Sequence, residues 1–358
     1  MERGFPILSW LLSFYTFNSY ISNSYQYILE LNNKCKMKLL FNLSGEHPKL
    51  PKAEIFAVLE SEDITHRICS EDKGNRILIL DVDTQNPLFI KRLAMTKRVG
   101  EFIGISKDLR VSAHRLYERI SKGTFAVESE SQTIREKLGE EIWKLGFNVD
   151  LLNPDTRILC FRDDQGSYRI AIETPLERDF AERKPQYRPY FHPTSIDPKI
   201  ARVLVNLARV RKNDRLLDPF CGTGGILIEA GLMGMKLSGY DIDGRMVEGC
   251  IENLRYYGLN GKIREGDAMK LDQIDERVDA IVTDPPYGRS SFMTERNIEK
   301  FYEKFLLSAS KVLDPGKYLI MILPDSSDLK TDKFEVKENY SLYVHKSLTR
   351  KIFVLRRK

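Results

Sequence analysis

The sequence predicts an α/β protein in which a domain with a mainly parallel sheet follows a smaller α+β region. From residue 191 onward, short apolar runs alternate with helical stretches in a regular strand and helix rhythm. Such repetition is typical of a parallel sheet with helices on both faces, whose ligands bind beyond the carboxyl ends of the strands. Before residue 175 the order of strands and helices is mixed. The length of 358 residues leaves room for two or three domains.

The α+β region is predicted to span residues 37–174. It begins with the strand-like run KLLFNL, and a helical stripe of Ile55, Val58 and Leu59 follows. A hairpin that turns at residues 164–166 is predicted near its end. The pattern assigns no activity to this region, so a structural role is the default interpretation.

Residues 1–36 do not fit this scheme. Their aromatic and apolar run is interrupted by Ser, Thr and Asn, so it falls short of an uninterrupted membrane span. No small-residue cleavage site of a signal peptide follows it. Because Met37 directly opens the first strand-like run, we interpret residues 1–36 as an upstream extension from a misassigned start codon.

Composition narrows the class of protein. Lys and Arg number 56 against 51 acidic residues, and a net charge of +5 does not by itself indicate nucleic-acid binding. The five cysteines are scattered without metal-ligand spacing, which predicts a reducing cytoplasm and no metal site.

Residues 175–190 are charged, punctuated by proline and without periodicity, so they are predicted to be a linker before a domain at residues 191–358.

Carboxylates close several strands of the second domain. One strand ends at Asp218 and leads into a turn with Gly222 and Gly224 that opens a helix. Such a turn exposes backbone N–H groups to a ligand, although its spacing matches neither a dinucleotide fold nor a P-loop. Asp241 ends the next strand and Asp267 follows a further one. Because parallel strands end at one edge, we expect these carboxylates to lie together there.

A fourth strand ends in Asp284, Pro285, Pro286 and Tyr287. Two consecutive prolines fix both φ angles, so the chain leaves the sheet stiffly. The Asp284 carboxylate and the Pro285 carbonyl can then act as two acceptors at a fixed spacing, with Tyr287 as an aromatic plate beside them. This combination suits an exocyclic amine on a flat nucleobase.

These motifs resemble those of a known family. DPFCGTG, GYDID, GDA and DPPYG, in that order, are similar to the motifs of S-adenosylmethionine-dependent amino-methyltransferases with a Rossmann-like fold. RPYFHPTSIDPKIARVLVNLA and DPPYGRSS resemble more closely the archaeal tRNA guanine-10 N2-methyltransferases, which carry a ferredoxin-like segment and a THUMP RNA-binding domain in front. The resemblance covers Met37 to Lys358 and is strongest from Arg188 onward.

The resemblance implies a role for each matching residue. Asp284, Pro285, Pro286 and Tyr287 would hold the target guanine, and aspartate rather than asparagine at the first position suits its N2 amine, because an ionised carboxylate only accepts hydrogen bonds. The cofactor S-adenosylmethionine would bind through its methionine half, its ribose and its adenine, and the matching residues are Thr194, Asp218, Gly222, Gly224, Asp241, Asp267 and Ala268.

RNA contacts are predicted for four basic residues near the linker and the DPPY motif, namely Arg183, Lys184, Arg188 and Arg289. The C-terminal run HKSLTRKIFVLRRK adds a basic cluster, which is more often a solvated surface. The resemblance implies a cytoplasmic, monomeric enzyme without membrane contact that converts a guanosine of tRNA, G10, to N2-methyl- and N2,N2-dimethylguanosine. The alternatives are an N2-guanine methyltransferase for another tRNA position or for rRNA, and a non-catalytic RNA-binding protein with this fold.

Overall fold

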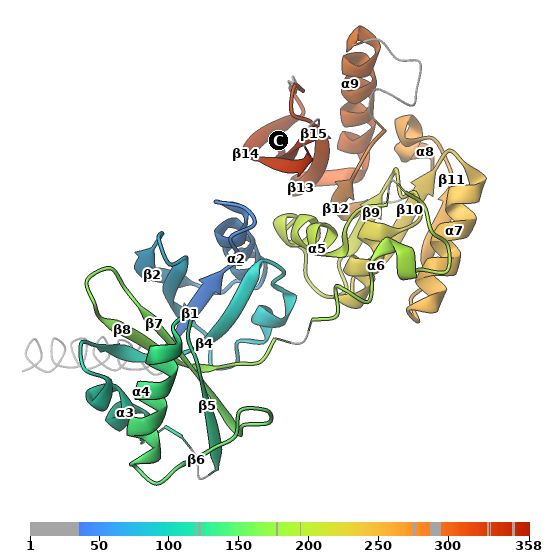
Figure 1. Cartoon of the computed structure of the whole chain (residues 1–358). Helices are drawn as coiled ribbons and strands as arrows, with labels where there is room; N and C mark the ends of the chain where they lie inside the picture. Colours follow the sequence, from blue (N-terminus) through green and yellow to red (C-terminus); the bar gives the residue numbers. More distant parts are fainter. Residues whose placement is uncertain are drawn as a thin grey trace, which may run out of the picture.

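The computed structural model describes residues 36–117, 119–120, 123–176, 178–193, 195–274, 277–286, 295–327, 329, 331–345 and 348–358. Figure 1 shows two bodies side by side. The N-terminal one, from β1 to β8 and coloured blue to green, is called the front region, and the C-terminal domain runs from yellow to red. Among the described residues, no helix has both the length and the apolar character that a membrane crossing requires.

One sheet runs through the whole front region. Its strand order is β2-β3-β1-β4-β8-β7-β5-β6, with β1 antiparallel to both of its neighbours and β5 parallel to β6 and β7. The predicted hairpin is confirmed, because Phe161 faces Arg169 in the antiparallel pair β7 and β8. The strands are β1 (Lys36–Leu43), β2 (His66–Asp72), β3 (Ile77–Asp83), β4 (Thr96–Ser106), β5 (Thr124–Glu128), β6 (Asn148–Val149), β7 (Thr156–Arg162) and β8 (Tyr168–Glu173).

The helices of the front region pack on this sheet and bury two separate apolar cores. Ile55, Val58 and Leu59 on α2 are fully buried in one core, so the predicted helical stripe is confirmed. The second core lies under α3 and α4 and contains Leu116 and Leu138. The helices of the front region are α2 (Leu50–Ser61), the 3-10 helix η1 (Leu88–Arg92), α3 (Leu109–Tyr117) and α4 (Gln132–Trp143).

The C-terminal domain contains the predicted, mainly parallel sheet. Its order is β11-β10-β9-β12-β13-β15-β14, parallel from β11 to β13 and antiparallel for β14 and β15. Consecutive side chains of β9, Leu216 and Leu217, belong to different cores, because helices cover both faces of the sheet. The strands are β9 (Arg215–Asp218), β10 (Lys236–Asp241), β11 (Gly261–Glu265), β12 (Val278–Thr283), β13 (Leu313–Pro324), β14 (Phe334–His345) and β15 (Leu348–Arg357).

Helices α5, α6 and α7 pack on one face of the parallel strands, and α8 and α9 pack on the other. Asp197 caps α5, since its carboxylate accepts from the backbone N–H groups of Lys199 and Ile200. The 3-10 helix η2 (Pro185–Tyr187) lies in the connection from β8 to α5. The remaining helices are α5 (Pro198–Leu207), α6 (Gly225–Leu232), α7 (Gly244–Tyr256), η3 (Ala268–Lys270), α8 (Leu271–Ile274) and α9 (Glu295–Val312).

The front region packs tightly on the C-terminal domain through α2 and α5. Glu54 of α2 is fully buried there and accepts hydrogen bonds from Ala94 N, Met95 N and Asn206 Nδ2, each at 2.8 Å. Burial raises the pKa of Glu54, and these hydrogen bonds oppose the rise. The contact joins the two parts through a buried polar network as well as through apolar side chains.

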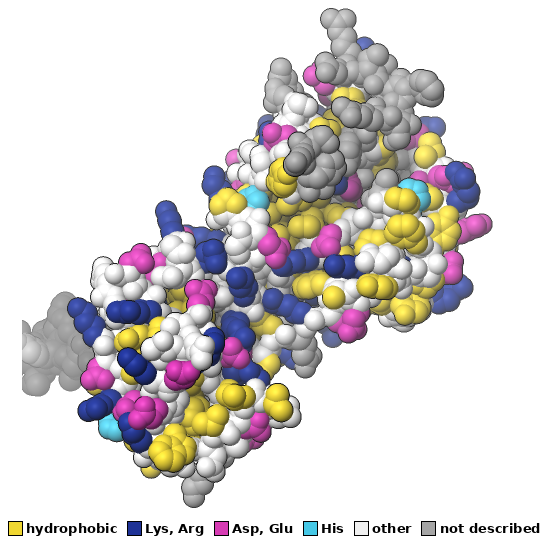
Figure 2. All heavy atoms as spheres, viewed as in Figure 1, with side chains coloured by type: hydrophobic (Ala, Val, Ile, Leu, Met, Phe, Trp, Pro, Cys, Tyr) yellow, Lys and Arg dark blue, Asp and Glu magenta, His cyan; other side chains and the backbone are white. Residues whose placement is uncertain are grey.

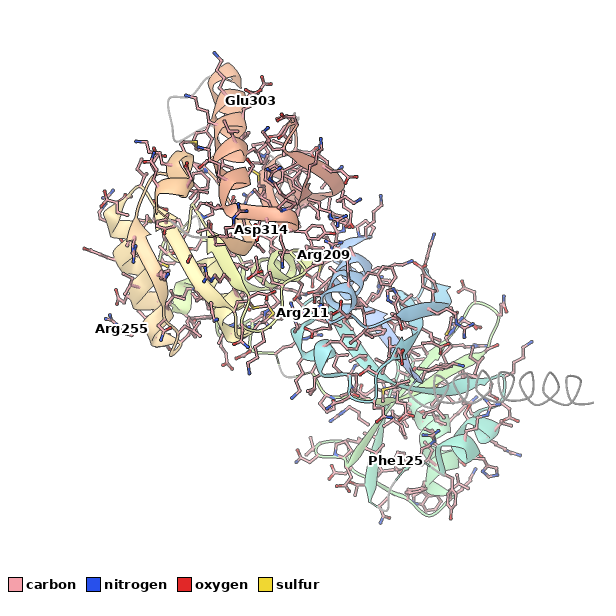
Figure 3. The ribbon with its side chains drawn as sticks, turned by 180° about the vertical axis from the view of Figure 1, so that it is seen from behind. Phe125, Arg209, Arg211, Arg255, Glu303 and Asp314 are labelled. Carbon is pink, nitrogen blue, oxygen red and sulfur yellow. The ribbon has the colours of Figure 1, made fainter. Side chains whose placement is uncertain are left out.

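Ion pairs surround this contact. Figure 3 shows Arg209 and Arg211 at the junction. Arg209 contacts Glu60 of the front region and Glu338 of β14, both at 3.1 Å, and its guanidinium stacks on the ring of Tyr318. These contacts fix the orientation of the front region, which places it beside the sheet of the C-terminal domain.

Candidate active site at the carboxyl ends of the parallel strands

The structure brings the predicted strand-end carboxylates to one edge. The strands β11, β10, β9 and β12 are neighbours in one parallel sheet, so Asp218, Asp241 and Asp284 follow one another along its carboxyl edge. A cavity of about 100 Å³ opens there, and Asp218, Thr223 and Asp284 are among the residues that line it. Of the four expected strand-end carboxylates, Asp218 and Asp284 line one cavity, and Asp241 ends the strand next to that of Asp218.

The glycine turn after β9 has a backbone that side chains would strain. Gly222 and Gly224 have φ values of +49° and +86°, and Gly224 is the N-cap of α6 without a side-chain cap. A Cβ on Gly224 would lie 2.7 Å from Cys250 Sγ. The backbone N–H of Gly222 donates to Asp241 Oδ2 at 2.9 Å, so the turn is tied to the end of β10.

Asp218 is the most deeply buried carboxylate of this edge, with 2% of its surface exposed. It accepts from Thr283 Oγ1 at 2.7 Å and from Phe220 N at 3.2 Å. Burial raises the pKa of Asp218 to about 7, the negative charges of Asp284 and Asp241 add to the rise, and the two hydrogen bonds oppose it. A cation bound beside Asp218 would favour its ionised form.

Asp241 and Asp267 hold the loops that follow β10 and β11. The carboxylate of Asp241 also accepts from Asp243 N at 3.0 Å. Asp267 is the N-cap of η3, where its side chain accepts from Met269 N at 2.9 Å, and Ala268 beside it is 4% exposed. Asp267 and Ala268 follow β11, which is two strands away from β9 in the sheet, and they are not among the residues that line the 100 Å³ cavity.

Asp284 is paired with a cation that sequence reasoning missed. Arg350 Nη2 of β15 donates to Asp284 Oδ1, and the side chains are 10% and 19% exposed. Burial raises the pKa of Asp284, and the charge of Arg350 opposes this rise. Sequence analysis assigned no role to Arg350, and its run of basic residues is typical of a solvated surface, whereas Arg350 is 9% exposed. No local signal separates Arg350 from the other cations of its strand.

The remainder of the DPPY motif is described only in part. Pro285 is buried and Pro286 is exposed. Tyr287, Arg289 and Thr194, to which sequence analysis gave roles in base stacking, RNA contact and cofactor binding, lie outside the described residues.

Comparisons with known proteins identify the family of this chain. The family model of the RMKL-like methyltransferase domain matches residues 185–352. The tRNA (guanine(10)-N2)-dimethyltransferase of Methanothermobacter thermautotrophicus is 40% identical over 337 residues, which cover 90% of this chain and 100% of that protein. The enzyme of the same name from Methanocaldococcus jannaschii is 32% identical, with coverages of 88% and 98%. This chain belongs to the family of archaeal tRNA (guanine(10)-N2)-dimethyltransferases.

Solved structures show the same fold for this dimethyltransferase family member. TrmN from Thermus thermophilus superposes with a TM-score of 0.54 at 21% identity and covers 90% of this chain and 100% of its own. SMU.472, a putative methyltransferase complexed with SAH, gives a TM-score of 0.51 at 15% identity, with coverages of 90% and 98%. Both likenesses extend over the front region as well as the C-terminal domain.

The structure buries two residues that were predicted to contact RNA at the surface of this dimethyltransferase family member. Arg183 and Arg188 are only 5% and 4% exposed, so their expected position on the surface is wrong. Arg183 Nε donates to Glu229 Oε1 at 2.7 Å, and Arg188 Nε donates to the Arg183 carbonyl at 3.1 Å. Glu229 of α6 is buried and pairs with Arg183 of the linker and Arg202 of α5. Because a buried charge requires such partners, the linker packs against α6. Lys184 is exposed as expected.

Asn253 is a further residue that sequence analysis missed. Its Nδ2 donates to the Tyr190 carbonyl at 3.0 Å and to the Thr223 carbonyl at 2.9 Å, while its Oδ1 accepts from Tyr190 N at 2.9 Å. Ser195 and Thr223 are also joined, with 2.8 Å between their hydroxyl oxygens. These bonds hold the segment before α5 against the glycine turn. Because Asn253 lies on α7, this helix supports the residues that line the cavity.

Proposed function

We propose that this protein methylates the exocyclic N2 of guanosine 10 in tRNA and gives N2-methylguanosine and then N2,N2-dimethylguanosine. The observation that carries this proposal is the position of Asp284, which closes β12 beside the cavity that Asp218 and the glycine turn line. The relatives of the same name, with up to 40% identity over nearly their whole length, support the same substrate.

The methyl donor in this proposal is S-adenosylmethionine, which supplies a methyl group as an electrophile. The residues of the cavity fit such a ligand. Asp218 is a buried carboxylate that a positively charged ligand would keep ionised, and Gly222 and Gly224 allow a close approach to the backbone. Asp241, Asp267 and Ala268 follow the adjacent strands and would hold the nucleoside part.

Asp284 and Pro285 would act on the guanine amine. The lone pair of an exocyclic amine is delocalised into the ring, which makes the nitrogen a weak nucleophile. Hydrogen bonds from its two N–H groups to the Asp284 carboxylate and the Pro285 carbonyl favour the localised lone pair and disperse the positive charge that develops on nitrogen. As the nitrogen bonds to the methyl carbon, the bond from that carbon to the sulfonium sulfur of the donor would break, S-adenosylhomocysteine would leave, and the proton of the nitrogen would pass to Asp284 or to solvent. Tyr287 would stack on the flipped base.

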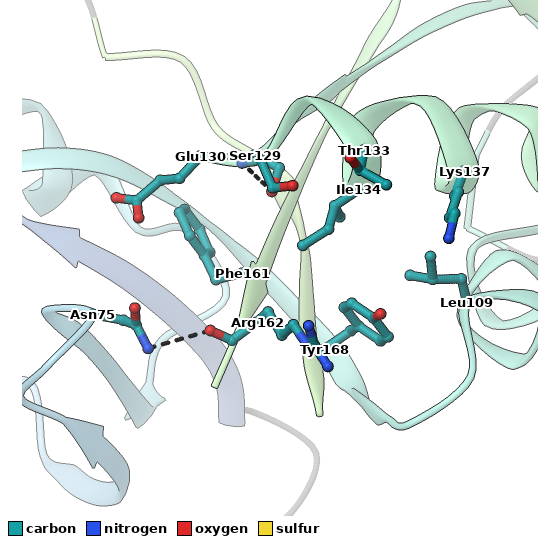
Figure 4. A pocket seen from close by; sticks show the side chains of 11 residues that line it. Asn75, Leu109, Ser129, Glu130, Thr133, Ile134, Lys137, Phe161, Arg162 and Tyr168 are labelled. Carbon is teal, nitrogen blue, oxygen red and sulfur yellow. Dashed lines mark hydrogen bonds between the residues drawn. The ribbon is translucent and has the colours of Figure 1, made fainter. Parts of the chain in front are cut away.

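RNA would bind across the junction of the two parts. On the face shown in Figure 2, Lys and Arg side chains gather where the front region meets the C-terminal domain, as a phosphate backbone requires. The front region also has a cavity of about 530 Å³, which Figure 4 shows. Its lining combines Phe161 and Tyr168 with Lys137 and Arg162, a combination that suits stacked bases and phosphates.

We therefore include a THUMP-type RNA-binding role for the front region in the proposal, together with Lys184 and Arg289 as RNA contacts and action as a monomer in the cytoplasm. Another tRNA position is the second candidate function. The tRNA (guanine(6)-N2)-methyltransferase of Methanocaldococcus jannaschii is 28% identical over 69% of this chain. Position 10 is favoured because the relatives named for it are more similar and cover more of the chain.

The test is a methylation assay on defined transcripts. The purified protein is incubated with labelled S-adenosylmethionine and tRNA transcripts that carry guanosine or adenosine at position 10, and the nucleosides are identified after digestion. We expect N2-methylated guanosine only when position 10 is guanosine. Asp284→Ala should abolish the product, whereas Asp272→Ala, which removes an exposed carboxylate of α8, should not. Product from the position-10 adenosine transcript would refute the proposed position.

A further inference from the structure

We propose that Arg350 is a positioning residue for the methyl transfer. It holds one oxygen of Asp284, keeps this carboxylate charged, and leaves the second oxygen to accept a hydrogen bond from the guanine amine. The inference rests on the proposed function and adds a residue of β15 to a site that the ends of the parallel strands otherwise build.

The sheet order brings the two residues together. Asp284 follows β12 and Arg350 lies in β15, with β13 between these strands. Arg350 faces Pro324, the last residue of β13, at the carboxyl edge of the parallel strands. Its Nη2 donates to Asp284 Oδ1 over the end of β13, and both side chains are mostly buried. The antiparallel direction of β15 therefore delivers a guanidinium to the edge where the cavity opens.

The charges around Asp284 explain why a cation is needed there. Asp218 from β9 and Asp241 from β10 contribute negative charge at the same edge, and His192 lines the cavity from the segment before α5. Asp218 and Asp241 accept from hydroxyl and backbone N–H groups, whereas Asp284 is bonded to a guanidinium. Burial disfavours the charged form of Asp284, and Arg350 opposes this effect.

The protonation state of Asp284 decides whether it can hold an amine. A charged carboxylate only accepts hydrogen bonds, but a protonated carboxyl also presents an O–H donor. A donor directed at the N–H groups of guanine would replace attraction by repulsion. Because Arg350 donates to Oδ1, we assign Oδ2 as the oxygen that accepts from the guanine amine.

The experiment is a comparison of rates across pH. Single-turnover methylation of tRNA is measured between about pH 6 and pH 9.5 for the wild type, Arg350→Met and Arg350→Lys. Loss of a partner of opposite charge raises the pKa of a carboxyl by about 1–3 units. We expect the acidic limb of the Arg350→Met profile to move up by at least about one pH unit, with a loss of ~10-fold or more near pH 6.5 and a much smaller loss near pH 9. Arg350→Lys should recover most of the acidic limb.

Two controls isolate the role of Arg350. Arg356→Met removes a guanidinium from the same strand, where it contacts the Gly316 carbonyl, and should leave the profile unchanged. In an Asp284→Asn background, the amide at position 284 does not titrate, so adding Arg350→Met should change the residual rate much less than it does in the wild type. The charge of Asp284 contributes to the raised pKa of Asp218, so the Asp284→Asn background is the control that separates the two carboxyls.

The outcomes are distinct. An unchanged acidic limb in Arg350→Met would overturn the role of Arg350 and leave the proposed function intact, because the wild type would still form N2-methylguanosine. A loss that is equal at every pH and is not recovered by Arg350→Lys would also overturn it, since that result marks a purely structural contact. Absence of product from the wild type would instead refute the proposed function. If Arg350→Met does not fold, Arg350→Gln, which keeps a polar side chain without the charge, replaces it in the same comparison and in the Asp284→Asn background.

Discussion

Replacement of Glu54 by alanine is predicted to destabilise the chain strongly, because this carboxylate is buried between the front region and the C-terminal domain. The change removes the acceptor of three buried N–H groups, those of Ala94 N, Met95 N and one of the two on Asn206 Nδ2, whose other hydrogen bond to the Arg92 carbonyl at 2.9 Å remains. Each unsatisfied buried donor costs about 1–3 kcal/mol. Removal of a buried carboxyl offsets part of this cost, so we expect a net loss of about 3–5 kcal/mol in the free energy of unfolding.

The assay is equilibrium unfolding in urea, with Glu60→Ala as the matched control. Glu60 lies on the same helix, but its side chain is 56% exposed and pairs with Arg209 at the surface, so its loss should cost less than about 1 kcal/mol. Because burial raises the pKa of Glu54 in the folded state, its carboxyl contributes most at low pH and less as the pH rises through that pKa. Equal urea midpoints for Glu54→Ala and Glu60→Ala would show that the buried network does not hold the two parts together.

Further predictions concern the glycine turn, Asp218 and the linker. Gly224→Ala combines a φ of +86° with a Cβ only 2.7 Å from Cys250 Sγ, so we expect a destabilisation of about 1–3 kcal/mol and at least ~10-fold weaker binding of S-adenosylmethionine in calorimetric titration. The pKa of Asp218 is raised to about 7, so its contribution to stability is complete below its ordinary value and is lost as the pH rises through about 7. Unfolding free energies should therefore fall between about pH 4 and pH 7 in the wild type, and Asp218→Asn should flatten this slope. Arg183→Met removes one of two cations from the buried Glu229 and should lower the free energy of unfolding by about 2–3 kcal/mol, whereas an unchanged melting temperature would contradict the buried pair.

Local sequence patterns were sufficient to predict where the strand-end carboxylates of the candidate site lie. The alternation of short strands and helices predicted a parallel sheet, and in such a sheet consecutive strand ends meet by topology alone. Asp218, Asp241 and Asp284 could therefore be placed together without any knowledge of tertiary contacts. The left-handed turn at Gly224 also follows from the sequence, because glycine adopts that backbone conformation without strain.

Burial of charged side chains could not be predicted in this way. Arg183 stands in a polar, proline-rich stretch that is typical of an exposed linker, yet it pairs with Glu229, 46 residues further along the chain. A local sequence pattern shows composition and hydrophobic periodicity. Which residue a buried charge pairs with depends instead on which surfaces come into contact when the chain folds. The same limit applies to Glu54, whose acceptor role involves Asn206, 152 residues away.

The sequence by itself determined the class of the fold, the order of the motifs and the acceptors at the end of β12, because these depend on periodicity, turn chemistry and chain order. Only the tertiary structure decided that Arg350 lies beside Asp284, 66 residues earlier. The reason is the strand order, in which β15 lies between β13 and β14 and runs antiparallel to both. Strand order is set by long-range packing, so the cation that contacts Asp284 comes from near the C-terminus, and no local sequence pattern distinguishes it.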